Sequence, residues 1–467
     1  MRRRYLYVSL VLILFVCCHI ILFGLVPDSA TFPSNDVSAL GERIDQLQRI
    51  LDEQARNSAR LKAFVDIELR KLRDLTTTTT TIASSPTSLT TSDVTTKSPA
   101  ANANAQNQPP IAVLVFACNR PAAITYHVSK LLRYRPSAVQ FPVVISQDCD
   151  SIPVADAVRA FGSNISYIKH ESAQKAGIQV PSNHAQYASY YMIARHYKLA
   201  LTHVFEKLNF SAAIITEDDL DIAEDFFEYF GATRPLLDSD RSLMCVSAWN
   251  DNGKAGLIDA NATELLYRSD FFSGLGWMLT RRLWEELSPI WPAGFWDDWL
   301  RDPARRQNRA CIRPEIPRTS MTNQGKVGAS QGLFFSKHLI KIKLNERPFS
   351  FTQANLSYLL QDRYDADFIN NVYASREVTL EQLQNQTTSA DSKALEAVRL
   401  TYTSAKEFSG IAAKLQLMVD FKAGVPRTAY RGVVSCFVNN TRVFIAPPRS
   451  WTSYDPSWTG PPDIIEG

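Results

Sequence analysis

The 467-residue sequence lacks the short motifs that mark several large enzyme classes. It contains no His-Glu-x-x-His, no Gly-x-x-x-x-Gly-Lys-Ser/Thr and no Cys-x-x-Cys pattern. These absences exclude a zincin protease, a P-loop nucleotide hydrolase and a thioredoxin-type oxidoreductase. The chemistry of this chain therefore depends on other groupings of polar side chains.

An excess of charge of one sign is also missing. Lys and Arg number 50 against 47 Asp and Glu, and the formal net charge is only +3. The longest basic run is the three arginines at residues 2–4. Nucleic-acid-binding domains concentrate Lys and Arg on one surface, so we expect no nucleic-acid partner. Seven cysteines are too few for a disulfide-dense scaffold, whereas 45% hydrophobic residues suffice for a sizeable core.

The amino terminus carries an apolar run from Tyr5 to Val26, with His19 as its only strongly polar residue. As a helix this run measures about 33 Å, enough to cross a hydrocarbon core of about 30 Å. The alternative, a cleaved signal peptide, usually has an apolar region of only about 7–15 residues. We predict a cytosolic tail at 1–4 and a transmembrane signal anchor at 5–26, with the rest of the chain in a lumen or outside the cell.

Two segments separate this anchor from the remaining sequence. Apolar residues follow heptad spacing from Leu40 to Leu75, which predicts a stem at 27–75 with a coiled coil and possible self-association. An isolated helix is the alternative. Residues 76–110 contain six consecutive threonines and no aromatic residue, which predicts a disordered, O-glycosylated linker. Six Asn-x-Ser/Thr sequons agree with a lumenal location: Asn164, Asn209, Asn261, Asn355, Asn385 and Asn439.

From residue 111 onward the sequence alternates between two patterns. Apolar, β-branched runs at 111–118, 141–149, 211–219 and 242–250 predict strands, and helical segments lie between the earlier ones. This alternation predicts an α/β domain with a mainly parallel sheet. In such domains ligands bind beyond the carboxyl ends of the strands, and polar residues at those ends are therefore the first candidates for a site.

The cysteines of this region lead to a disulfide prediction. Cys118 and Cys149 each end a predicted strand. Adjacent strands lie about 4.8 Å apart, close to the Cα separation of a disulfide. If the two strands are neighbours, these cysteines are expected to form a bridge. Cys245 and Cys311 are the next candidate pair, which leaves Cys436 free.

Three acids follow one predicted strand directly, at Glu217, Asp218 and Asp219. Closely packed carboxylates repel one another unless a positive charge lies among them, and a divalent cation is the expected partner. Because only carboxylate oxygens are available, Mn²⁺ or Mg²⁺ fits better than structural zinc. A different role, complementing the dipole of a following helix, is predicted for the acids farther along: Asp221, Glu224 and Asp225.

A second candidate site lies at residues 294–303. Trp296 and Trp299 bracket Asp297 and Asp298, and aromatic rings beside acids suit sugar binding. One of the two acids is a candidate general base. The alternative is an amphipathic turn with core tryptophans and solvated acids. His196, taken alone, is interpreted as a packed histidine in a tyrosine-rich helix.

Eight segments, taken in order, resemble the Golgi N-acetylglucosaminyltransferase I family. They are ACNR (117–120), FPVVISQDC (141–149), YYMIARHYKLAL (190–201), EDDL (217–220), CVSAWNDNGK (245–254), GLGWML (274–279), FWDDW (295–299) and RACIRPEI (309–316). The resemblance covers nearly all of 111–467. It implies a nucleotide-sugar glycosyltransferase domain of GT-A-like fold at 111–345 and a smaller C-terminal domain at 346–467.

The resemblance also implies an activity. Members of the family transfer GlcNAc from UDP-GlcNAc, with Mn²⁺ and with inversion, to a high-mannose N-glycan on a glycoprotein. The new β-1,2 linkage forms on the α-1,3 mannose and starts hybrid and complex N-glycan synthesis. The implied location is the Golgi membrane, as a single-pass type II protein with a lumenal catalytic head.

The matching motifs assign roles to individual residues. The resemblance implies that Asp219 binds the metal and that Asp297 is the catalytic base. Glu217 and Asp218 are expected to contact ribose or the donor sugar. The other expected contacts are with uridine and phosphate (Arg120, Asp148, His196), with GlcNAc (Leu275, Trp296) and, from a closing loop, with the donor (Ser330).

Two other functions are considered. The first is transfer of β-1,2-GlcNAc to O-linked mannose. Enzymes of that kind carry a lectin-like domain ahead of the catalytic part, where this sequence shows only the predicted stem and linker. The second is a noncatalytic, membrane-tethered lectin that uses the acidic triplet for Ca²⁺. Transfer or hydrolysis of UDP-GlcNAc separates an enzyme from such a lectin.

Overall fold

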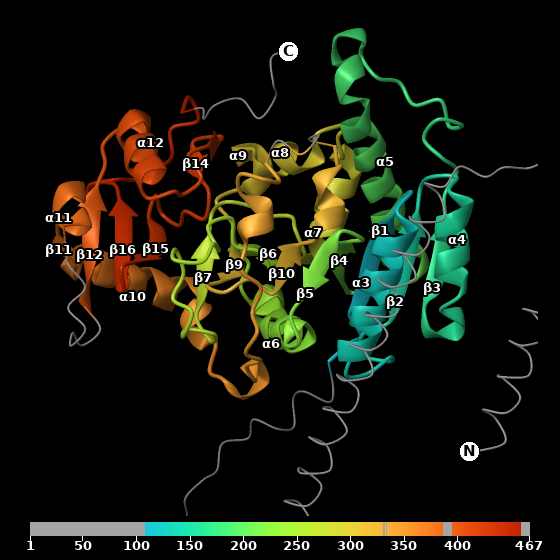
Figure 1. Cartoon of the computed structure of the whole chain (residues 1–467), viewed down its shortest axis with the longest axis horizontal. Coiled ribbons are helices and arrows are strands. Elements are labelled where there is room, and N and C mark those ends of the chain that lie inside the picture. The colour runs from blue at the N-terminus through green and yellow to red at the C-terminus, as the bar shows by residue number, and fades with distance from the viewer. Residues whose placement is uncertain (1–107, 330–331, 333, 386–394, 459–467) are drawn as a thin grey trace, which may run out of the picture. The chain divides into compact units, whose positions relative to one another are not determined.

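The computed structural model describes residues 108–329, 332, 334–385 and 395–458 (Figure 1). The predicted tail, anchor, stem and most of the linker lie outside these residues, as does Ser330. Among the described helices none is both long and apolar enough to cross a membrane. The anchor at 5–26 and the self-associating stem at 27–75 stay predictions.

The larger sheet of the described region has eight strands in the order β3-β2-β1-β4-β8-β6-β9-β7. Four of its seven pairings are parallel, and β3, β2, β1 and β4 form a wholly parallel half. Strand β8 runs antiparallel between β4 and β6. The bounds are β1 Ala112–Ala117, β2 Val143–Gln147, β3 Ser166–Lys169, β4 Ala212–Glu217, β6 Leu243–Ser247, β7 Leu266–Ser269, β8 Trp277–Thr280 and β9 Ala310–Pro314. The predicted α/β class, the mainly parallel sheet and the four predicted strands are confirmed.

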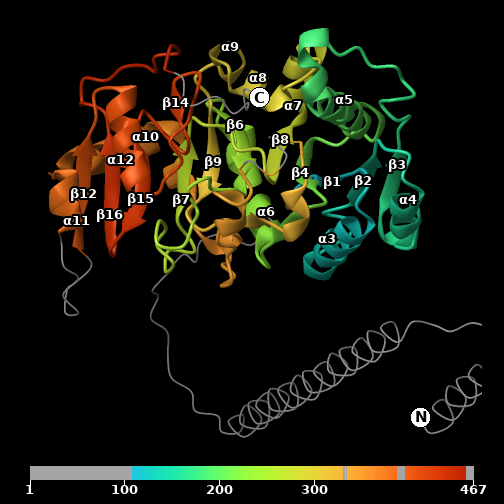
Figure 2. The same cartoon turned by 45° about the horizontal axis from the view of Figure 1, so that its top comes forward.

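Helices cover both faces of this sheet because successive strand residues point to opposite sides. Val113 and Val115 share one buried core with helices α3, α4 and α6, and Ala112 and Leu114 share another with α5, α7 and α8. Figure 2 shows the sheet between the two helical layers. The bounds are α3 Pro121–Tyr134, α4 Ile152–Arg159, α5 Ala188–Thr202, α6 Phe226–Ser239, α7 Arg281–Leu287, α8 Trp296–Arg301 and α9 Pro303–Arg306.

A smaller sheet follows in the sequence, with the order β11-β12-β16-β15, and it lies beside β7 in Figure 1. Phe408 and Ala412 of α12 pack on one of its faces, and Val372 of α10 packs on the other. Residues between the sheets, such as Phe351 and Leu359, belong to the core of the larger sheet. The bounds are α10 Gln361–Ala374, β11 Arg376–Glu377, α11 Leu380–Gln384, β12 Leu395–Thr401, α12 Ala405–Lys414, β15 Val434–Val438 and β16 Thr441–Ala446. The domain boundary at 345/346 stays a prediction.

Two short antiparallel pairs complete the described strands. Strand β5 (Leu220–Ile222) pairs with β10 (Thr319–Met321), immediately after the acidic triplet. Strands β13 (Phe421–Lys422) and β14 (Val425–Pro426) form a hairpin. Both pairs contribute side chains to the cavity described below.

Two disulfides join cysteines of the described chain, and both predicted pairings are confirmed. Cys118 and Cys149, at the ends of the neighbouring strands β1 and β2, have Cα atoms 4.9 Å apart. Cys245 and Cys311 face each other on β6 and β9 with a Cα separation of 4.6 Å. Cys436 is buried and free, as expected.

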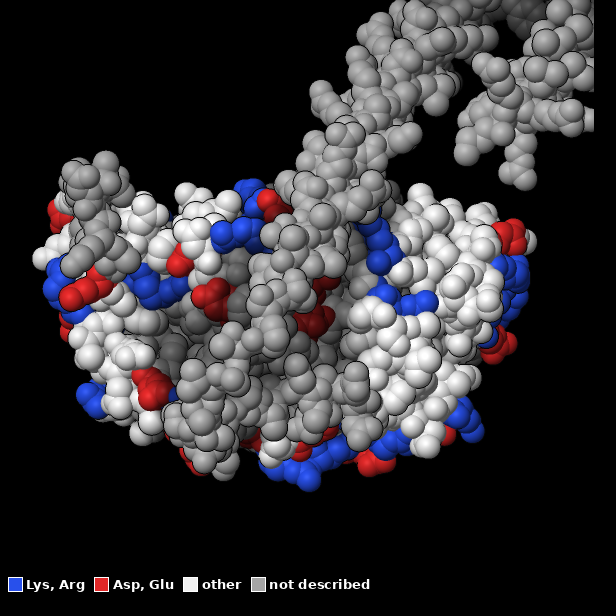
Figure 3. Space-filling model, turned by 90° about the horizontal axis from the view of Figure 1, so that it is seen from below, with Lys and Arg blue, Asp and Glu red and all other residues white. Residues whose placement is uncertain are grey.

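The surface in Figure 3 carries basic and acidic side chains in small, interspersed groups. The described residues on this face form no continuous basic patch. This face therefore offers none of the concentrated positive charge that nucleic-acid binding requires.

Candidate active site

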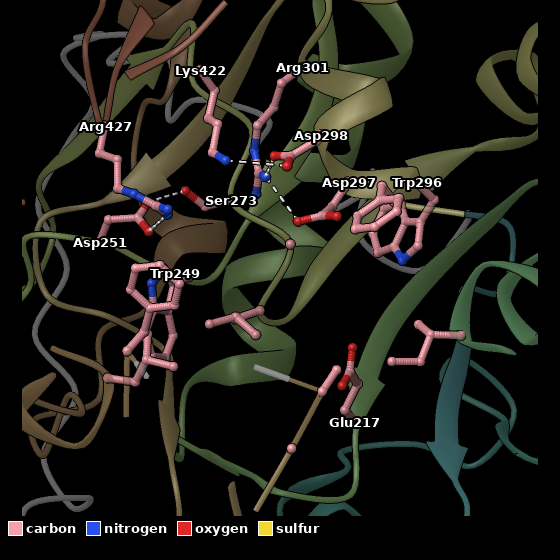
Figure 4. A pocket seen from close by; sticks show the side chains of 18 of the residues that line it. Glu217, Trp249, Asp251, Ser273, Trp296, Asp297, Asp298, Arg301, Lys422 and Arg427 are labelled. Carbon is pink, nitrogen blue, oxygen red and sulfur yellow. Dashed lines mark hydrogen bonds and ion pairs between the residues drawn. The ribbon is translucent and has the colours of Figure 1, made fainter. Parts of the chain in front are cut away.

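The described residues form a cavity of about 690 Å³ beyond the carboxyl end of β4. This volume lies within the range of about 300–1,000 Å³ that is common for small-molecule sites. Five residues predicted for the site line it: Glu217, Asp219, Leu275, Trp296 and Asp297. Figure 4 shows Glu217 on one side of the open space and Asp297 with Trp296 on the other.

The acidic triplet begins at Glu217, the last residue of β4, and lies next to Arg120, which follows the neighbouring parallel strand β1. Arg120 Nη2 donates to Asp218 Oδ1 at 2.5 Å, and its Nη1 donates to Asp219 Oδ2 at 2.8 Å. Burial raises the pKa of Asp218 to about 7, although the charge of Arg120 opposes the shift. Burial, together with the charge of Asp219, raises the pKa of Glu217 to about 7. One arginine thus leaves the triplet short of positive charge.

Two carboxylate oxygens of this triplet have no hydrogen-bond partner although they are buried, namely Asp218 Oδ2 and Asp219 Oδ1. The main chain at Asp219 is fixed, because its carbonyl oxygen accepts from both the N–H and the hydroxyl of Thr322 at 2.8 Å. Unsatisfied buried oxygens are costly and call for a cation or an unrecorded donor.

The donor set decides which metal these oxygens fit. Within the described ranges no three His, Cys, Asp or Glu side chains are grouped to hold one ion. This arrangement does not fit a structural zinc site, which needs four protein ligands. It does fit a hard cation that takes a single protein carboxylate and completes its coordination with phosphate oxygens and water. Asp219 lines the cavity and is therefore the candidate for that contact.

The opposite wall is helix α8, where Arg301 holds both acids of the Trp-Asp-Asp-Trp segment. Arg301 Nη1 donates to Asp297 Oδ2 at 2.9 Å and to Asp298 Oδ1 at 2.6 Å. Its Nε donates to the carbonyl of Phe272 at 3.0 Å, which fixes the guanidinium. The Asp297 side chain remains 38% exposed, so a substrate hydroxyl can reach it.

The second acid has an additional partner. Lys422 Nζ, from β13, donates to Asp298 Oδ2 at 3.2 Å. Burial favours the neutral form of Asp298, but Arg301 and Lys422 outweigh it and lower the pKa of this carboxyl. Asp298 is thus a firmly ionised member of an ion-pair network, which leaves Asp297 as the better candidate for accepting a proton.

Tyr197 of α5 connects the two walls. Its ring stacks between Phe116, at a centroid distance of 4.0 Å, and Trp296, at 4.3 Å. Its hydroxyl donates to Glu217 Oε1 at 2.7 Å. One side chain therefore contacts both the carboxylate after β4 and the first residue of α8. The sequence interpretation gave Tyr197 no role.

Four predicted site residues do not line the cavity: Arg120, Asp148, Asp218 and His196. Asp148, just after β2, accepts from Arg195 Nη1 at 2.7 Å, and burial raises its pKa to about 6 against the opposing charge of Arg195. His196 is buried, its Nε2 lies 2.9 Å from Ser146 Oγ, and burial lowers its pKa well below the usual value. His196 is thus a neutral, hydrogen-bonded histidine in this structure.

The predicted helix-dipole role is wrong for Asp221. Because the chain first pairs β5 with β10, helix α6 begins only at Phe226. Asp221 lies within β5 and forms an ion pair with Lys130. Asp225 does occupy the N-cap position of α6, but its side chain caps no helical N–H and instead accepts from Arg318 at 3.0 Å and from Asn345.

Other cavity residues were missed entirely. Ser273 Oγ and Arg427 Nη1 both donate to Asp251, the latter at 2.9 Å, and Trp249 lies beside them (Figure 4). Arg301 had a detectable signal, since it lies three and four residues after the two acids on one helix. Arg427 had none, because its partner lies 176 residues away in sequence.

Comparison with known proteins identifies the family. Residues 9–458 match the GNT-I family. The chain belongs to the GNT-I family. A relative from Arabidopsis thaliana, the alpha-1,3-mannosyl-glycoprotein 2-beta-N-acetylglucosaminyltransferase, is 40% identical over 344 residues, which cover 73% of this chain and 75% of the relative. The GNT-I membership confirms the predicted family and makes the chain a glycosyltransferase.

Solved structures share more distant similarity with this GNT-I family member. A mannosyltransferase from Pyrobaculum calidifontis, solved with GDP-mannose and Mn²⁺, is 14% identical with a TM-score of 0.31, and the match covers 51% of this chain and 64% of that one. A glucosyl-3-phosphoglycerate synthase from Mycobacterium tuberculosis, solved with Mn²⁺, UDP-glucose and phosphoglyceric acid, is 15% identical with a TM-score of 0.31 and coverages of 47% and 74%. Both scores are low, and no conclusion about this chain rests on them.

Proposed function

We propose that this GNT-I family member transfers GlcNAc from UDP-GlcNAc, with inversion and in β-1,2 linkage, to the α-1,3 mannose of a high-mannose N-glycan. One observation carries the proposal. A single cavity holds an incompletely neutralised carboxylate site at Asp219 and, across open space, an accessible acid at Asp297. The relative from Arabidopsis thaliana, whose name states this activity, supports the choice of donor and acceptor.

Asp297 is the base in this proposal. Inversion by a direct displacement needs one group that removes the proton of the attacking hydroxyl. Arg301 keeps the Asp297 carboxylate in place through a hydrogen bond of 2.9 Å to Oδ2. Asp298 is held by two cations and is suited to positioning Arg301 rather than to accepting a proton.

The leaving group is UDP, and Asp219 would hold the Mn²⁺ ion that accompanies it. When bound, Mn²⁺ supplies positive charge that stabilises a departing diphosphate. Arg120 adds a fixed positive charge at the same end of the cavity, since it contacts Asp218 and Asp219. In this structure its Nη groups are engaged by Asp218, Asp219 and the carbonyl oxygen of Gln324.

The donor sugar fits between these groups. Glu217 offers a carboxylate held by Tyr197, and Leu275 and Trp296 offer apolar surface. Gly276, next to Leu275, has φ +87°, and a Cβ there would lie 2.5 Å from Thr319. Only glycine permits this approach of Thr319, in β10, to the loop that carries Leu275.

We further propose a Golgi location with a single type II anchor at 5–26 and a lumenal head. The apolar run after three arginines supports the anchor. The two disulfides support an oxidising compartment. A protease-protection assay, with a fluorescent tag on either the amino or the carboxyl terminus, would test this topology. The amino-terminal tag is expected to be cytosolic.

A transfer assay tests the proposed activity. The full-length protein is incubated with UDP-GlcNAc, Mn²⁺ and either a five-mannose N-glycan or an O-mannosyl peptide, and the product linkage is determined. We expect a β-1,2 product on the N-glycan. Product on the O-mannosyl peptide alone would establish the alternative acceptor. Glycan binding that needs Ca²⁺ and releases no UDP would establish a lectin.

A further inference from the structure

We propose that Tyr190 and Phe295 form the acceptor subsite, an aromatic shelf on which the apolar face of a mannose ring stacks beside Asp297. The inference rests on the proposed function and names the residues that recognise its acceptor. The shelf is defined as the two side chains Tyr190 and Phe295, both of which line the cavity.

The shelf is exposed where other aromatic residues of the site are not. The rings of Tyr190 and Phe295 stack at a centroid distance of 4.9 Å with an interplanar angle of 17°. Both side chains are half-buried, whereas Tyr197 is 1% exposed and Trp277 is fully buried. Each ring covers one face of the other, and the aromatic surface that remains reaches the cavity, where it matches the apolar C–H face of a pyranose ring.

The backbone adopts an unusual conformation to place this shelf. Phe295 has φ 52° and ψ 43°, in the left-handed region that bulky residues avoid. Gly294 precedes it, and a Cβ at that position would lie 3.1 Å from the Tyr191 ring, so glycine permits close packing against α5. Strained residues concentrate at functional sites. Here the conformation separates two consecutive rings: Trp296 enters the core, while Phe295 pairs with Tyr190.

Helix α5 sets the distance between the proposed donor and acceptor ends of the cavity. Tyr190 and Tyr197 are seven residues apart, so they lie on the same face of the helix and about 10 Å apart along its axis. Tyr197 contacts Glu217 and Trp296, at the donor end of the cavity. Tyr190 contacts Phe295. Consecutive residues of the α8 segment thus pair with two tyrosines separated by about the length of two sugar rings.

The shelf also lies within the electrostatic reach of the base. Burial raises the pKa of Tyr190, and the carboxylates of Asp297 and Asp298 raise it further. The Tyr190 hydroxyl is thus a protonated donor near Asp297, available to a sugar hydroxyl. Phe295 precedes Asp297 by two residues, so a ring seated on the shelf lies beside the group that accepts the proton.

Steady-state kinetics with the full-length enzyme test the proposal. Tyr190→Ala and Phe295→Leu remove aromatic surface, and Tyr190→Phe keeps the ring while removing the hydroxyl. The KM for a five-mannose N-glycan is expected to rise about tenfold in Tyr190→Ala and about fivefold in Phe295→Leu, but less than threefold in Tyr190→Phe. The dissociation constant of UDP, measured by calorimetry with Mn²⁺, is expected to change less than twofold.

A matched control is Tyr126→Ala, which removes an exposed tyrosine ring from α3 outside the cavity. It is expected to leave the acceptor KM unchanged. Equal losses of acceptor and UDP affinity in Tyr190→Ala would assign the shelf to the donor and overturn the proposal. An acceptor KM that stays at the wild-type value in Tyr190→Ala and Phe295→Leu would overturn it as well. If the wild-type enzyme transfers nothing to the N-glycan, the proposed function itself fails.

Discussion

The two walls of the cavity differ in how far their carboxylates are neutralised by neighbouring cations. On the wall at the end of β4, Arg120 forms ion pairs with Asp218 and Asp219, and two buried carboxylate oxygens of these acids have no partner among the described residues. On the α8 wall, two acids share Arg301 and Lys422, and the pKa of Asp298 is lowered. The first wall is therefore complete only when a ligand brings positive charge. The second is already organised before any ligand binds.

Because of this difference, mutations at the two walls are expected to affect different steps. A preorganised group reacts without rearrangement, which suits the residue that accepts a proton. Raised carboxylate pKa values at the other wall represent free energy that a bound cation recovers. Mutations at the α8 wall are thus expected to affect turnover, and mutations at the β4 wall to affect binding.

The largest expected effect is at the α8 wall. Asp297→Asn removes the proposed base but keeps the shape of the side chain, so kcat is expected to fall by about 10²–10⁴-fold while the UDP dissociation constant is retained. Asp298→Asn is the matched control and is expected to lose less than about tenfold in kcat, because Asp298 only positions Arg301. Equal losses in the two variants, measured by GlcNAc transfer, would contradict the different roles assigned to these acids.

The next effect is at the β4 wall. Removing metal with a chelator is expected to weaken UDP binding in the wild-type protein, and Mn²⁺ is expected to restore it. Asp219→Ala is expected to abolish the restoration. Asp221→Ala, which changes an acid in β5 that is paired with Lys130, is expected to behave like the wild type. Calorimetric UDP affinity that is indifferent to Mn²⁺ in the wild-type protein would refute the metal assignment.

A smaller effect is expected where the walls meet. Tyr197→Phe keeps the ring stacked on Trp296 but removes the hydrogen bond to Glu217. The loss of one hydrogen bond to a carboxylate, about 1 kcal/mol, predicts a rise of about fivefold in the KM for UDP-GlcNAc. The kcat is expected to change little. A large fall in kcat with an unchanged donor KM would show that Tyr197 acts on α8 rather than on Glu217.

The last expected effect concerns stability and its dependence on pH, away from the two walls. Burial raises the pKa of Asp148 to about 6. A carboxyl with a raised pKa ionises more easily in the unfolded chain, so its contribution to the free energy of unfolding falls as pH rises from about 4 to about 6. Asp148→Asn is expected to be about 1–2 kcal/mol more stable than the wild type at pH 7.5 and equally stable at pH 4. Thermal denaturation at both pH values measures this, and a less stable variant at pH 7.5 would show that the ion pair with Arg195 dominates.

The parts of the fold that the sequence predicted correctly depend on short segments. The strand at 111–118 is a continuous apolar run, and the strand at 211–219 contains an apolar run at 212–215 that the three acids follow closely in sequence. The pairing of Cys118 with Cys149 needed only the assumption that two successive strands are neighbours, which the structure confirms. Such signals lie within short segments of the sequence, so they can be recognised without knowledge of the tertiary structure.

The missed parts depend on contacts between distant residues. Lys422 reaches Asp298 across 124 residues, and no spacing rule links a C-terminal hairpin to helix α8. The antiparallel orientation of β8 in the sheet also has no local sequence signal, since Trp277–Thr280 is as apolar as a parallel strand would be. The helix-dipole role predicted for Asp221 is wrong because Asp221 pairs with β10, a strand about a hundred residues later that no local pattern announces.

A crystal structure of the protein with UDP-GlcNAc and Mn²⁺ tests the central claim most directly. The account predicts the diphosphate at the wall that carries Asp219, the metal on Asp219, and the anomeric carbon of GlcNAc facing Asp297 across the space for one hydroxyl group. A nucleotide bound away from Asp219, or an anomeric carbon directed away from Asp297, would contradict it.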